Sequence, residues 1–555
     1  MMLKTYQYRT YEYEPCHEQQ TGEIVRHPVI VVGGGPTGLT AALDLAQQGI
    51  HVVLLDDDNT VSAGSRAICF AKRSLELFDR LGVVAPMRGK GVTWNVGKLF
   101  YKADEVFRFN LLPEAGHAHP AFINLQQYYA EQYLVDGLLV QPLADLRWLN
   151  KVVAVEPHDD FVRVTVETPD GRYQTECDWL IAADGARSTV RHELGLPWAG
   201  EHYEEKFLIT DIVMTADFPP ERWFWFAPSF GGGHSALLHM QPDNVYRLDF
   251  QLGRDADPVE AAKPENVIPR VKAMLGDDVP FELEWVSVYS FSSHQLDKFV
   301  HGRVIFAGDA AHLMSVFGAR GANSGIQDAD NLVWKLKLVL DGKAPVELLH
   351  SYSTERVYAA RENLLYTGSS VKFISPSSPG ALALRNAVLE LAQNYEFARP
   401  FINSGRLSTA TVMADSPLNT PDEDVFNTRL VPGAPCVDAP VQIDGHDGYL
   451  LAQLGGQFDG LLYVADVAQI TPETWANLRQ LAQGAVAIRP LLITAKPGDG
   501  NGRVLILDTK DYVKQRYDMQ DGTFYLCRPD QTICARWRQL DVTKVKAALA
   551  RACCL

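Results

Sequence analysis

The feature that most constrains the fold is an apolar run that breaks into glycines where a helical pattern begins. Residues 29–39 read Val-Ile-Val-Val-Gly-Gly-Gly-Pro-Thr-Gly-Leu, which places Gly33, Gly35 and Gly38 at GxGxxG spacing. The first glycine allows a tight turn out of a strand, the second lets the backbone approach a pyrophosphate, and the third lets the next helix pack against the sheet. The sequence therefore predicts a βαβ unit that binds a dinucleotide.

The residues after the motif supply the rest of such a unit. A helix is predicted over residues 36–48, with Gly49 at its end, and an apolar strand over residues 51–55. Asp56 follows that strand, where an acid is placed to bind ribose hydroxyls. Without this context the glycines would indicate only a turn in an ordinary βαβ unit.

Composition and charge narrow the classes of function. With 46% hydrophobic and 21% charged residues, the 555-residue chain is expected to form two or three globular domains. Its net charge of −17 argues against nucleic acid or an anionic membrane as a partner. The eight cysteines include no CxxC pair, so neither a metal site nor a disulfide framework is predicted. Residues 1–28 are polar and tyrosine-rich, and we expect a cytoplasmic protein whose N-terminal extension drapes over the first domain.

Two later junctions between a buried strand and a loop carry an acid. One strand ends in Asp184-Gly185, which suggests a second loop near the phosphates. The other ends in Gly308-Asp309, and a glycine-rich loop leads from it into a helix that begins near Gly321. That loop delivers Asp309 to a sugar and the helix N-terminus to an anion.

Between these motifs, the sequence indicates a loop, a helix and a set of strands. Arg66 lies on the loop, where an arginine suits a pyrophosphate but is equally typical of a solvated surface. Gln127 lies at the start of a helix predicted to end near Leu139. Residues 146–184 alternate like antiparallel strands.

A polar row is predicted on two neighbouring strands between residues 235 and 252. His239 and Gln241 alternate with apolar residues on one strand, as do Arg247 and Asp249 on the next. Strand pairing would bring these side chains together along one face. The face lines a pocket or, equally, faces water.

Taken together, the three motifs resemble those of the class A flavoprotein aromatic hydroxylases, the family of p-hydroxybenzoate hydroxylase and phenol hydroxylase. The resemblance covers residues 28–362. It implies an α/β fold: a Rossmann-like FAD-binding domain with an inserted antiparallel-sheet substrate domain. The final 120 residues resemble the thioredoxin-like C-terminal domain of the phenol hydroxylase branch, especially residues 526–530 and 533–537. Lacking CxxC, this tail is expected to act as a scaffold or a contact in a homodimer.

The domain boundaries expected from these patterns divide the chain into six parts. They are an N-terminal extension (1–27), the FAD-binding domain in two parts (28–197 and 300–402), the substrate sheet (198–299), a linker (403–435) and the C-terminal domain (436–555).

The resemblance also implies roles for single residues towards a noncovalent FAD. Asp56 binds the adenosine ribose, Asp309 bonds the ribityl chain, and Asp184 assists FAD binding and nicotinamide access. The remaining residues implied to contact FAD are Gly33, Gly35, Gly38, Arg66, Gln127, Gly308, Gly321, Ala322 and Asn323. The loss of Asp309 is expected to weaken FAD retention far more than the loss of Asp530 in the tail.

Two positions depart from the family pattern. Ser315 and Val316 stand where many relatives have a Pro-Pro pair, so a proline carbonyl contact cannot be carried over. The acid after the second strand is Asp56, where glutamate is frequent, and no arginine follows it immediately.

The implied reaction is the hydroxylation of a phenolic or other aromatic ring. NADH or NADPH reduces FAD, O2 adds at flavin C4a, and the resulting hydroperoxide transfers an oxygen atom to the ring. We expect His239 and Asp249 to handle the phenol proton and Arg247 to face the flavin. Trp225, Gln241 and Phe317 are expected to position the small aromatic substrate. A single histidine on a strand is more often structural, and that alternative stays open for His239.

Two other functions compete with this one. Residues 223–228 weakly resemble the W-x-W-x-x-P motif of flavin halogenases, with mismatches at Arg222 and Ala227. The second is a flavin-binding regulatory protein that does not hydroxylate. A different FAD-dependent oxidoreductase activity is a further enzymatic alternative.

Overall fold

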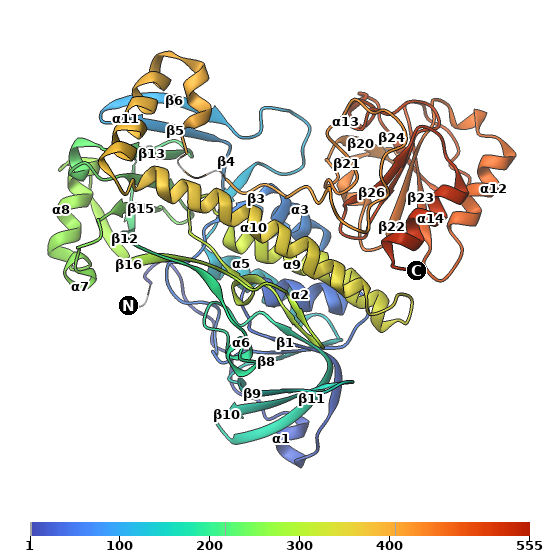
Figure 1. The fold of residues 1–555 in the computed structure, drawn as a ribbon, viewed down its shortest axis with the longest axis horizontal. Coiled ribbons are helices and arrows are strands. Elements are labelled where there is room, and N and C mark those ends of the chain that lie inside the picture. Colours follow the sequence, from blue (N-terminus) through green and yellow to red (C-terminus); the bar gives the residue numbers. More distant parts are fainter. Residues whose placement is uncertain (1–2, 217, 404, 406) are drawn as a thin grey trace.

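Three large β-sheets organise the chain (Figure 1). The computed structural model describes residues 3–555 except 217, 404 and 406. Within those residues, sheets I and II have eight strands each, sheet III has seven, and a small sheet has three. Sheet III forms the lobe at the right of Figure 1, and the long helices α9 (Gly321–Leu340) and α10 (Leu348–Ile374) cross the centre of the molecule. The predicted α/β class is confirmed.

Sheet I is built around the glycine motif. Its central strands are parallel in the order β18-β11-β1-β2-β8. Strand β2 and the end of β1 are apolar and buried, as expected of parallel strands covered on both faces. Helix α2 packs against α5 and α9. The strands are β1 (Arg26–Val32), β2 (Val52–Leu55), β8 (Ala144–Arg147), β9 (Lys151–Pro157), β10 (Val162–Thr168), β11 (Gly171–Ala182), β17 (Val300–His301) and β18 (Val304–Phe306).

The two helices predicted next to sheet I, α2 and α5, follow their predicted ranges closely. Helix α2 ends one residue earlier than predicted, and Gly49 follows its C-cap with a φ of 82°. The helices are α1 (His17–Thr21), α2 (Pro36–Gln47), α3 (Lys72–Arg80), α4 (Val84–Lys90), α5 (Gln127–Leu139) and α6 (Thr189–Glu193). Among the described residues, no helix has both the length and the apolar composition needed to span a bilayer.

One part of the predicted antiparallel segment is wrong. Strand β8 pairs with β2 in parallel, and only β9, β10 and the first half of β11 form an antiparallel meander. The second half of β11 then joins the parallel centre beside β1. Period-2 alternation gives the face of each residue but not the direction of the neighbouring strand, because both sheet types share that period.

Sheet II has the order β19-β16-β12-β15-β14-β13-β5-β6. Its pairs are antiparallel except β13 with β5. Strands β5 and β6 come from residues 96–110, so residues 198–299 do not build this sheet alone, contrary to the predicted boundary. The strands are β5 (Val96–Tyr101), β6 (Asp104–Asn110), β12 (Ala199–Met214), β13 (Arg222–Phe226), β14 (Ala236–Met240), β15 (Val245–Gln251), β16 (Phe281–Gln295) and β19 (His312–Leu313).

Short elements complete this part of the molecule. Helix α8 covers one face of sheet II, where Val267 and Val271 join the core formed by Leu208 and Leu248. Three strands make the small sheet: β3 (Cys69–Ala71), β4 (Val92–Trp94) and β7 (Phe122–Asn124). The helices here are α7 (Pro258–Ala261), α8 (Pro264–Leu275) and α11 (Pro379–Asn394), with 3-10 turns η1 (Ser229–Gly231), η2 (Gly308–Ala310) and η3 (Glu396–Phe401).

Sheet III and its helices form the C-terminal lobe. The sheet runs β21-β20-β24-β23-β22-β25-β26, with β22, β23 and β24 parallel. A likeness to thioredoxin stays a prediction. The elements are β20 (Pro440–Ile443), β21 (His446–Tyr449), η4 (Leu451–Gln453), β22 (Phe458–Tyr463), η5 (Val467–Gln469), α12 (Pro472–Leu481), β23 (Ile488–Thr494), β24 (Val504–Leu507), α13 (Tyr512–Arg516), β25 (Phe524–Cys527), β26 (Ile533–Trp537) and α14 (Val542–Ala552).

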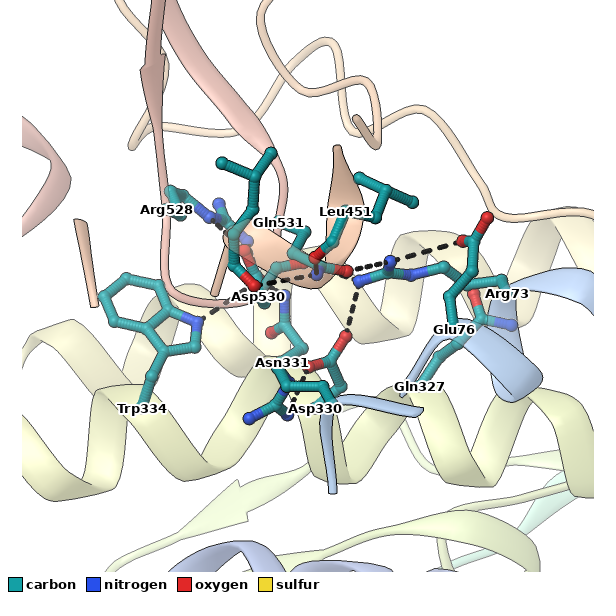
Figure 2. Close-up of polar contacts among 12 residues, drawn as sticks. Arg73, Glu76, Gln327, Asp330, Asn331, Trp334, Leu451, Arg528, Asp530 and Gln531 are labelled. Carbon is teal, nitrogen blue, oxygen red and sulfur yellow. Dashed lines mark hydrogen bonds and ion pairs between the residues drawn. The ribbon is translucent and has the colours of Figure 1, made fainter. Parts of the chain in front are cut away.

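The turn between β25 and β26 docks the C-terminal lobe onto α3 and α9 (Figure 2). Arg73 of α3 donates to the Asp530 carbonyl oxygen at 2.7 Å, to Gln531 Oε1 at 2.7 Å and to Asp330 at 2.8 Å. Trp334 and Asn331 of α9 each donate to Asp530 Oδ2 at 3.2 Å. Asp530 is therefore part of a buried contact with the helix that carries Gly321 at its start.

Charged residues next to this contact are also buried. Arg528 donates to Glu355 at 2.6 Å and also pairs with Asp530. Lys335 donates to Glu355 at 2.7 Å. Burial opposes ionisation of Glu355, but Arg528 and Lys335 hold the pKa of this carboxyl well below its usual value. These ion pairs bind α9, α10 and the C-terminal lobe together, because separating them would leave unpaired charges away from water.

The first prediction concerns this buried ion pair. Arg528→Ala should lower the free energy of unfolding by about 3–5 kcal/mol, because Glu355 and Asp530 lose their shared cation while buried. Urea or thermal unfolding measures the change. Arg26→Ala is the matched control, since Arg26 forms ion pairs with Asp160 and Asp178 at the surface and should matter little. Equal losses in the two variants would contradict the structural role of Arg528.

Candidate active site

The glycine motif forms a turn in which no larger residue fits at Gly33 or Gly38. Gly33 has a φ of 105°, and a Cβ there would lie 2.5 Å from the Ala183 carbonyl oxygen. A Cβ at Gly38 would lie 2.0 Å from the Gly33 carbonyl oxygen, so glycine is what allows α2 to approach the turn. A Cβ at Gly35 would meet nothing within 4 Å, and this residue is the N-cap of α2. The open space therefore lies at a helix N-terminus, where a phosphate binds favourably.

Asp56 lies beside this turn. One carboxylate oxygen accepts a hydrogen bond from the Gly34 amide, and the other accepts from the Asp58 amide at 2.9 Å. Burial raises the pKa of Asp56 to about 6, against the effect of these two bonds. The carboxylate is thus held at the end of β2, next to the glycine turn, in the position expected of a ribose ligand.

Asp184 lies on the other side of the turn, at the end of β11. Its Oδ2 accepts from the Val190 amide at 3.1 Å, whereas its Oδ1 is buried without a hydrogen-bond partner among the described residues. Burial raises the pKa of this carboxyl. A buried polar atom without a partner is costly, so Oδ1 is a position that a ligand would satisfy.

The Gly308 loop meets the same place from β18. A Cβ at Gly308 would lie 2.6 Å from Thr37 Oγ1, and a Cβ at Gly325 would lie 2.3 Å from the same atom. Residue 37 begins α2 and residue 325 belongs to the first turns of α9, so both helices start at this point. A Cβ at Gly321 would lie 3.9 Å from Asp309 Oδ1. The side chain of Asp309 is exposed, and desolvation by the surrounding protein raises its pKa.

A buried network that the sequence reasoning missed fixes this loop. Asp328 Oδ2 accepts from the Gly308 amide at 2.9 Å and contacts His312 Nε2 at 2.6 Å. Arg356 Nε donates to Asp328 Oδ1 at 2.6 Å. Burial opposes ionisation, but His312 and Arg356 hold the pKa of Asp328 below its usual value. The spacing of Gly308, His312 and Asp328 was visible in the sequence, but their pairing required the turn from β18 into α9.

The side-chain amide of Asn323 is hydrogen-bonded to other residues of the protein through both its oxygen and its nitrogen. Its Oδ1 accepts from the Ala71 amide at 2.8 Å and Ser74 Oγ at 2.7 Å, and its Nδ2 donates to the carbonyls of Cys69 and Ala319. A contact of this residue with a flavin would therefore use its backbone. Gly321, Ala322 and Asn323 remain at the N-terminal turn of α9, where free amides and the helix dipole favour negative charge.

The loop between Asp56 and β3 is held to α5. Gln127 Oε1 accepts from the Ala67 amide at 3.1 Å, and its Nε2 donates to Glu131 at 2.8 Å. The side chain of Arg66 is exposed, and its carbonyl oxygen accepts from Arg247 at 2.8 Å. Gln127 thus positions the loop through protein contacts, and Arg66 keeps its guanidinium available.

Sheet II brings the predicted polar residues to one face. In the register of β14 and β15, His239 pairs with Arg247 and Leu237 with Asp249. Three atoms of this row, His239 Nδ1, Gln241 Oε1 and Asp249 Oδ1, are buried with no hydrogen-bond partner in the described part of the chain. Ser235 Oγ, on the same side of this strand, is also buried without a hydrogen-bond partner among the described residues. Unpaired buried atoms that converge on one face indicate that a ligand completes them.

The charges on this face set its chemistry. Arg247 donates to Asp211 at 3.1 Å and to Ser65. Burial, then Arg222 and Arg247, lower the pKa of His239 well below its usual value, so the imidazole is neutral. Burial raises the pKa of Asp249 to about 7, with Arg247 opposing the shift. The face therefore offers one carboxyl that titrates near neutral pH, Asp249, and one neutral imidazole that accepts a hydrogen bond.

Trp225, one of the residues expected to position the substrate, lies away from the polar row. Trp225 pairs with Ala236, on the face opposite His239, and stacks on Phe100 at 5.0 Å, so the structure does not bring it to the polar row. A substrate on the polar row would not reach it, because alternate strand residues face opposite sides of a sheet.

Phe317 packs on the same side as the polar row. It lies in one apolar cluster with Leu237, and its ring lies 5.1 Å from Phe207 and 5.4 Å from Phe291. In place of the expected Pro-Pro pair, Ser315 is buried and Val316 is 52% exposed.

The fold and the glycine turn agree with a known family. Residues 26–365 match the FAD-binding domain family. The chain belongs to this family. FAD is its cofactor. The residues fit FAD, because the open N-terminus of α2 suits the pyrophosphate, Asp56 suits the adenosine ribose and Asp309 suits the ribityl chain.

Individual relatives extend the likeness beyond the matched domain. A 3-(3-hydroxy-phenyl)propionate/3-hydroxycinnamic acid hydroxylase of Mycolicibacterium gilvum is 27% identical over 521 residues, covering 91% of this chain and 88% of that protein. A 12-dehydrotetracycline 5-monooxygenase/anhydrotetracycline 6-monooxygenase of Streptomyces rimosus is 31% identical over 380 residues, covering 66% of this chain and 73% of that protein.

Solved structures show the same architecture. The p-nitrophenol 4-monooxygenase PnpA of Pseudomonas putida superposes with a TM-score of 0.60 at 26% identity, covering 70% of this chain and 100% of that one. The flavin-dependent monooxygenase PieE, solved with FAD and substrate, has a TM-score of 0.78 at 22% identity and covers 95% of this chain and 99% of that one. At that identity the second likeness shows the fold, C-terminal lobe included.

The second prediction tests the cofactor contact of Asp309. Asp309→Ala should raise the Kd for FAD about 10- to 100-fold, since a hydrogen bond to a charged group contributes roughly 1.5–3 kcal/mol. Titration of the apoprotein with FAD measures this. The control is Asp255→Ala, an exposed carboxylate in the loop after β15. Asp530→Ala, the control suggested by the sequence, is unsuitable because Asp530 contacts α9. Unchanged FAD affinity in Asp309→Ala would overturn the assignment.

Proposed function

We propose that the protein is a FAD-dependent monooxygenase that hydroxylates a phenolic ring with O2 and NADH or NADPH. The observation that carries this proposal is the row of unpaired buried polar atoms on sheet II, formed by His239, Gln241 and Asp249. Family membership supplies the cofactor, and the relatives named as hydroxylases and monooxygenases support the reaction class.

The division of work follows from the geometry. When bound, FAD supplies the redox chemistry, taking a hydride from the nicotinamide and activating O2. The N-terminus of α2 would hold the pyrophosphate, and Asp309 would accept a hydrogen bond from the ribityl chain. The N-terminal turn of α9 stabilises negative charge on the reduced ring.

The substrate is oriented by the polar row. Asp249 in its ionised form accepts the phenol proton, which makes the ring a better nucleophile. The neutral imidazole of His239 accepts a hydrogen bond that orients the substrate. Arg247, fixed by Asp211, keeps the row and the loop at Arg66 together. The aromatic rings of Phe207, Phe291 and Phe317 form an apolar cluster that would exclude water from one end of the face and so limit side reactions with water.

The proposal also covers the location and the oligomeric state of the enzyme. We place the enzyme in the cytoplasm, where NADH and NADPH are available. A homodimer is proposed from the family resemblance.

A screen of phenolic acids distinguishes the candidate functions. Monooxygenase activity should appear as NAD(P)H oxidation stimulated by an aromatic compound, with a product one oxygen atom heavier by mass spectrometry. A requirement for halide, with a halogenated product, would instead support the halogenase alternative. FAD binding without stimulated oxidation by any compound would favour a regulatory protein.

The third prediction concerns His239. His239→Ala should keep FAD and its melting temperature but lose roughly 100-fold in substrate-stimulated turnover, the scale of a group that positions a proton transfer. Turnover per bound FAD and thermal unfolding are measured on the same preparation. His446→Ala, at an exposed position in the C-terminal lobe, is the control. A loss of stability with unchanged turnover per FAD would make His239 a structural residue.

The fourth prediction follows from the pKa of Asp249. Because burial raises this pKa to about 7, the carboxyl is protonated below that pH and accepts a proton above it. Stimulated turnover should therefore rise as pH increases through about 7. Asp249→Asn should lower turnover and abolish the rise. A wild-type profile that is flat across this range, or a rise retained in the variant, would exclude Asp249 as the acceptor.

A further inference from the structure

The N-terminal residues ahead of the matched family domain make specific contacts with the molecule. The family match begins at residue 26. Residues 4–11, which we call the N-terminal clasp, cross from sheet II to the helix α5 of the FAD-binding part. Glu284 of β16 accepts from the amides of Lys4 and Thr5, both at 2.8 Å, and from Thr5 Oγ1 at 2.7 Å. Glu284 is buried, so this end of the clasp is firmly attached.

The middle of the clasp packs on α5 through aromatic rings. Tyr6 lies 4.2 Å from Tyr128 and 4.9 Å from Tyr129, measured between ring centroids. Tyr8 lies edge-on to Tyr6 at 4.8 Å. Tyr11 stacks on Trp148 at 4.6 Å with the rings nearly parallel. Such contacts stabilise a segment that forms no strand or helix of its own.

From this position the clasp bonds the loop that joins Asp56 to Arg66. The Tyr8 hydroxyl accepts from the Gly64 amide at 2.9 Å. The Tyr11 amide donates to the Asn59 carbonyl at 2.8 Å, and Thr60 Oγ1 donates to the Arg9 carbonyl at 2.9 Å. These three bonds are spread along the loop, from just after Asp56 to just before Arg66.

The opposite side of the loop is fixed by the site itself. Ser62 donates from its amide and its hydroxyl to Glu131 at 2.7 Å each, and the Arg66 carbonyl accepts from Arg247. Gly64 has a φ of 81°, and a Cβ there would lie 2.5 Å from the Trp285 ring. The loop is therefore held by the clasp and also by α5, β15 and β16, the elements that carry Glu131, Arg247 and Trp285.

We propose that the clasp is part of the FAD site: it holds the loop at residues 57–67 closed over the cofactor and slows FAD release. Tyr8 is the positioning residue, because its hydroxyl holds the Gly64 amide two residues before Arg66. The proposal rests on FAD lying between Asp56 and Asp309, with Arg66 towards the pyrophosphate. A dinucleotide buried under a loop leaves only when the loop opens, and each bond that opening breaks slows its departure.

Release of FAD measures the role of Tyr8. Tyr8→Phe keeps the ring contacts and removes one hydrogen bond, so the FAD dissociation rate, followed by flavin fluorescence after dilution, should rise about fivefold. A chain that lacks residues 1–11 should release FAD faster still, while it retains the buried Glu18 and its contacts with His27 and Arg147. Tyr13→Phe is the matched control, because the Tyr13 hydroxyl has no hydrogen-bond partner among the described residues.

A second readout separates this effect from a general loss of stability. Hydrogen exchange should quicken at residues 57–67 in Tyr8→Phe and stay unchanged in sheet III. Equal dissociation rates in wild type, Tyr8→Phe and the shortened chain would overturn the proposal, as would faster exchange throughout the protein. Failure of the wild-type protein to bind FAD would instead contradict the cofactor assignment.

Discussion

The close approach of three backbone segments is the constraint on which the site depends. The turn at Gly33, the loop at Gly308 and the first turns of α9 meet around Thr37, and they do so because Gly38, Gly308 and Gly325 carry no side chain. Helix α2 and helix α9 consequently begin at one place. The two helix N-termini then lie close to the acids that follow β2, β11 and β18. A dinucleotide with two phosphates and two sugar-like chains matches that set of donors and acceptors.

Desolvation gives the second part of the site its reactivity. The polar row on sheet II is buried, but His239, Gln241 and Asp249 each keep an atom that no described residue satisfies. Such atoms cost free energy in the absence of a ligand and favour binding of a molecule that completes them. The same burial keeps His239 neutral and raises the pKa of Asp249 to about 7. The cost to stability and the raised proton affinity of Asp249 therefore have one physical cause.

Contacts distant in sequence hold these two parts in place. The C-terminal lobe binds α3 and α9 through Asp530, which accepts hydrogen bonds from Arg73, Asn331 and Trp334. Helix α9 is therefore held near the site by Asn323 and Asp328 and in its middle by the lobe. The N-terminal clasp acts from the opposite direction on the loop at Gly64. The N-terminal clasp and the C-terminal lobe, which lie outside the cofactor motifs, thus position the elements that carry those motifs.

The sequence by itself determined the βαβ unit, the acids at 56, 184 and 309, and the alternation that places His239 and Asp249 on one face. These features are local: glycine spacing and period-2 or period-3.6 patterns depend only on neighbouring residues. Tertiary structure alone decided that β8 runs parallel to β2 and that β5 and β6 complete sheet II. It also decided that Trp225 faces away from the polar row, that Asp328 fixes the Gly308 loop, and that Asp530 is buried against α9. Strand order, strand direction and side-chain partners join residues far apart in the chain, and they follow from which surfaces pack together rather than from any local pattern.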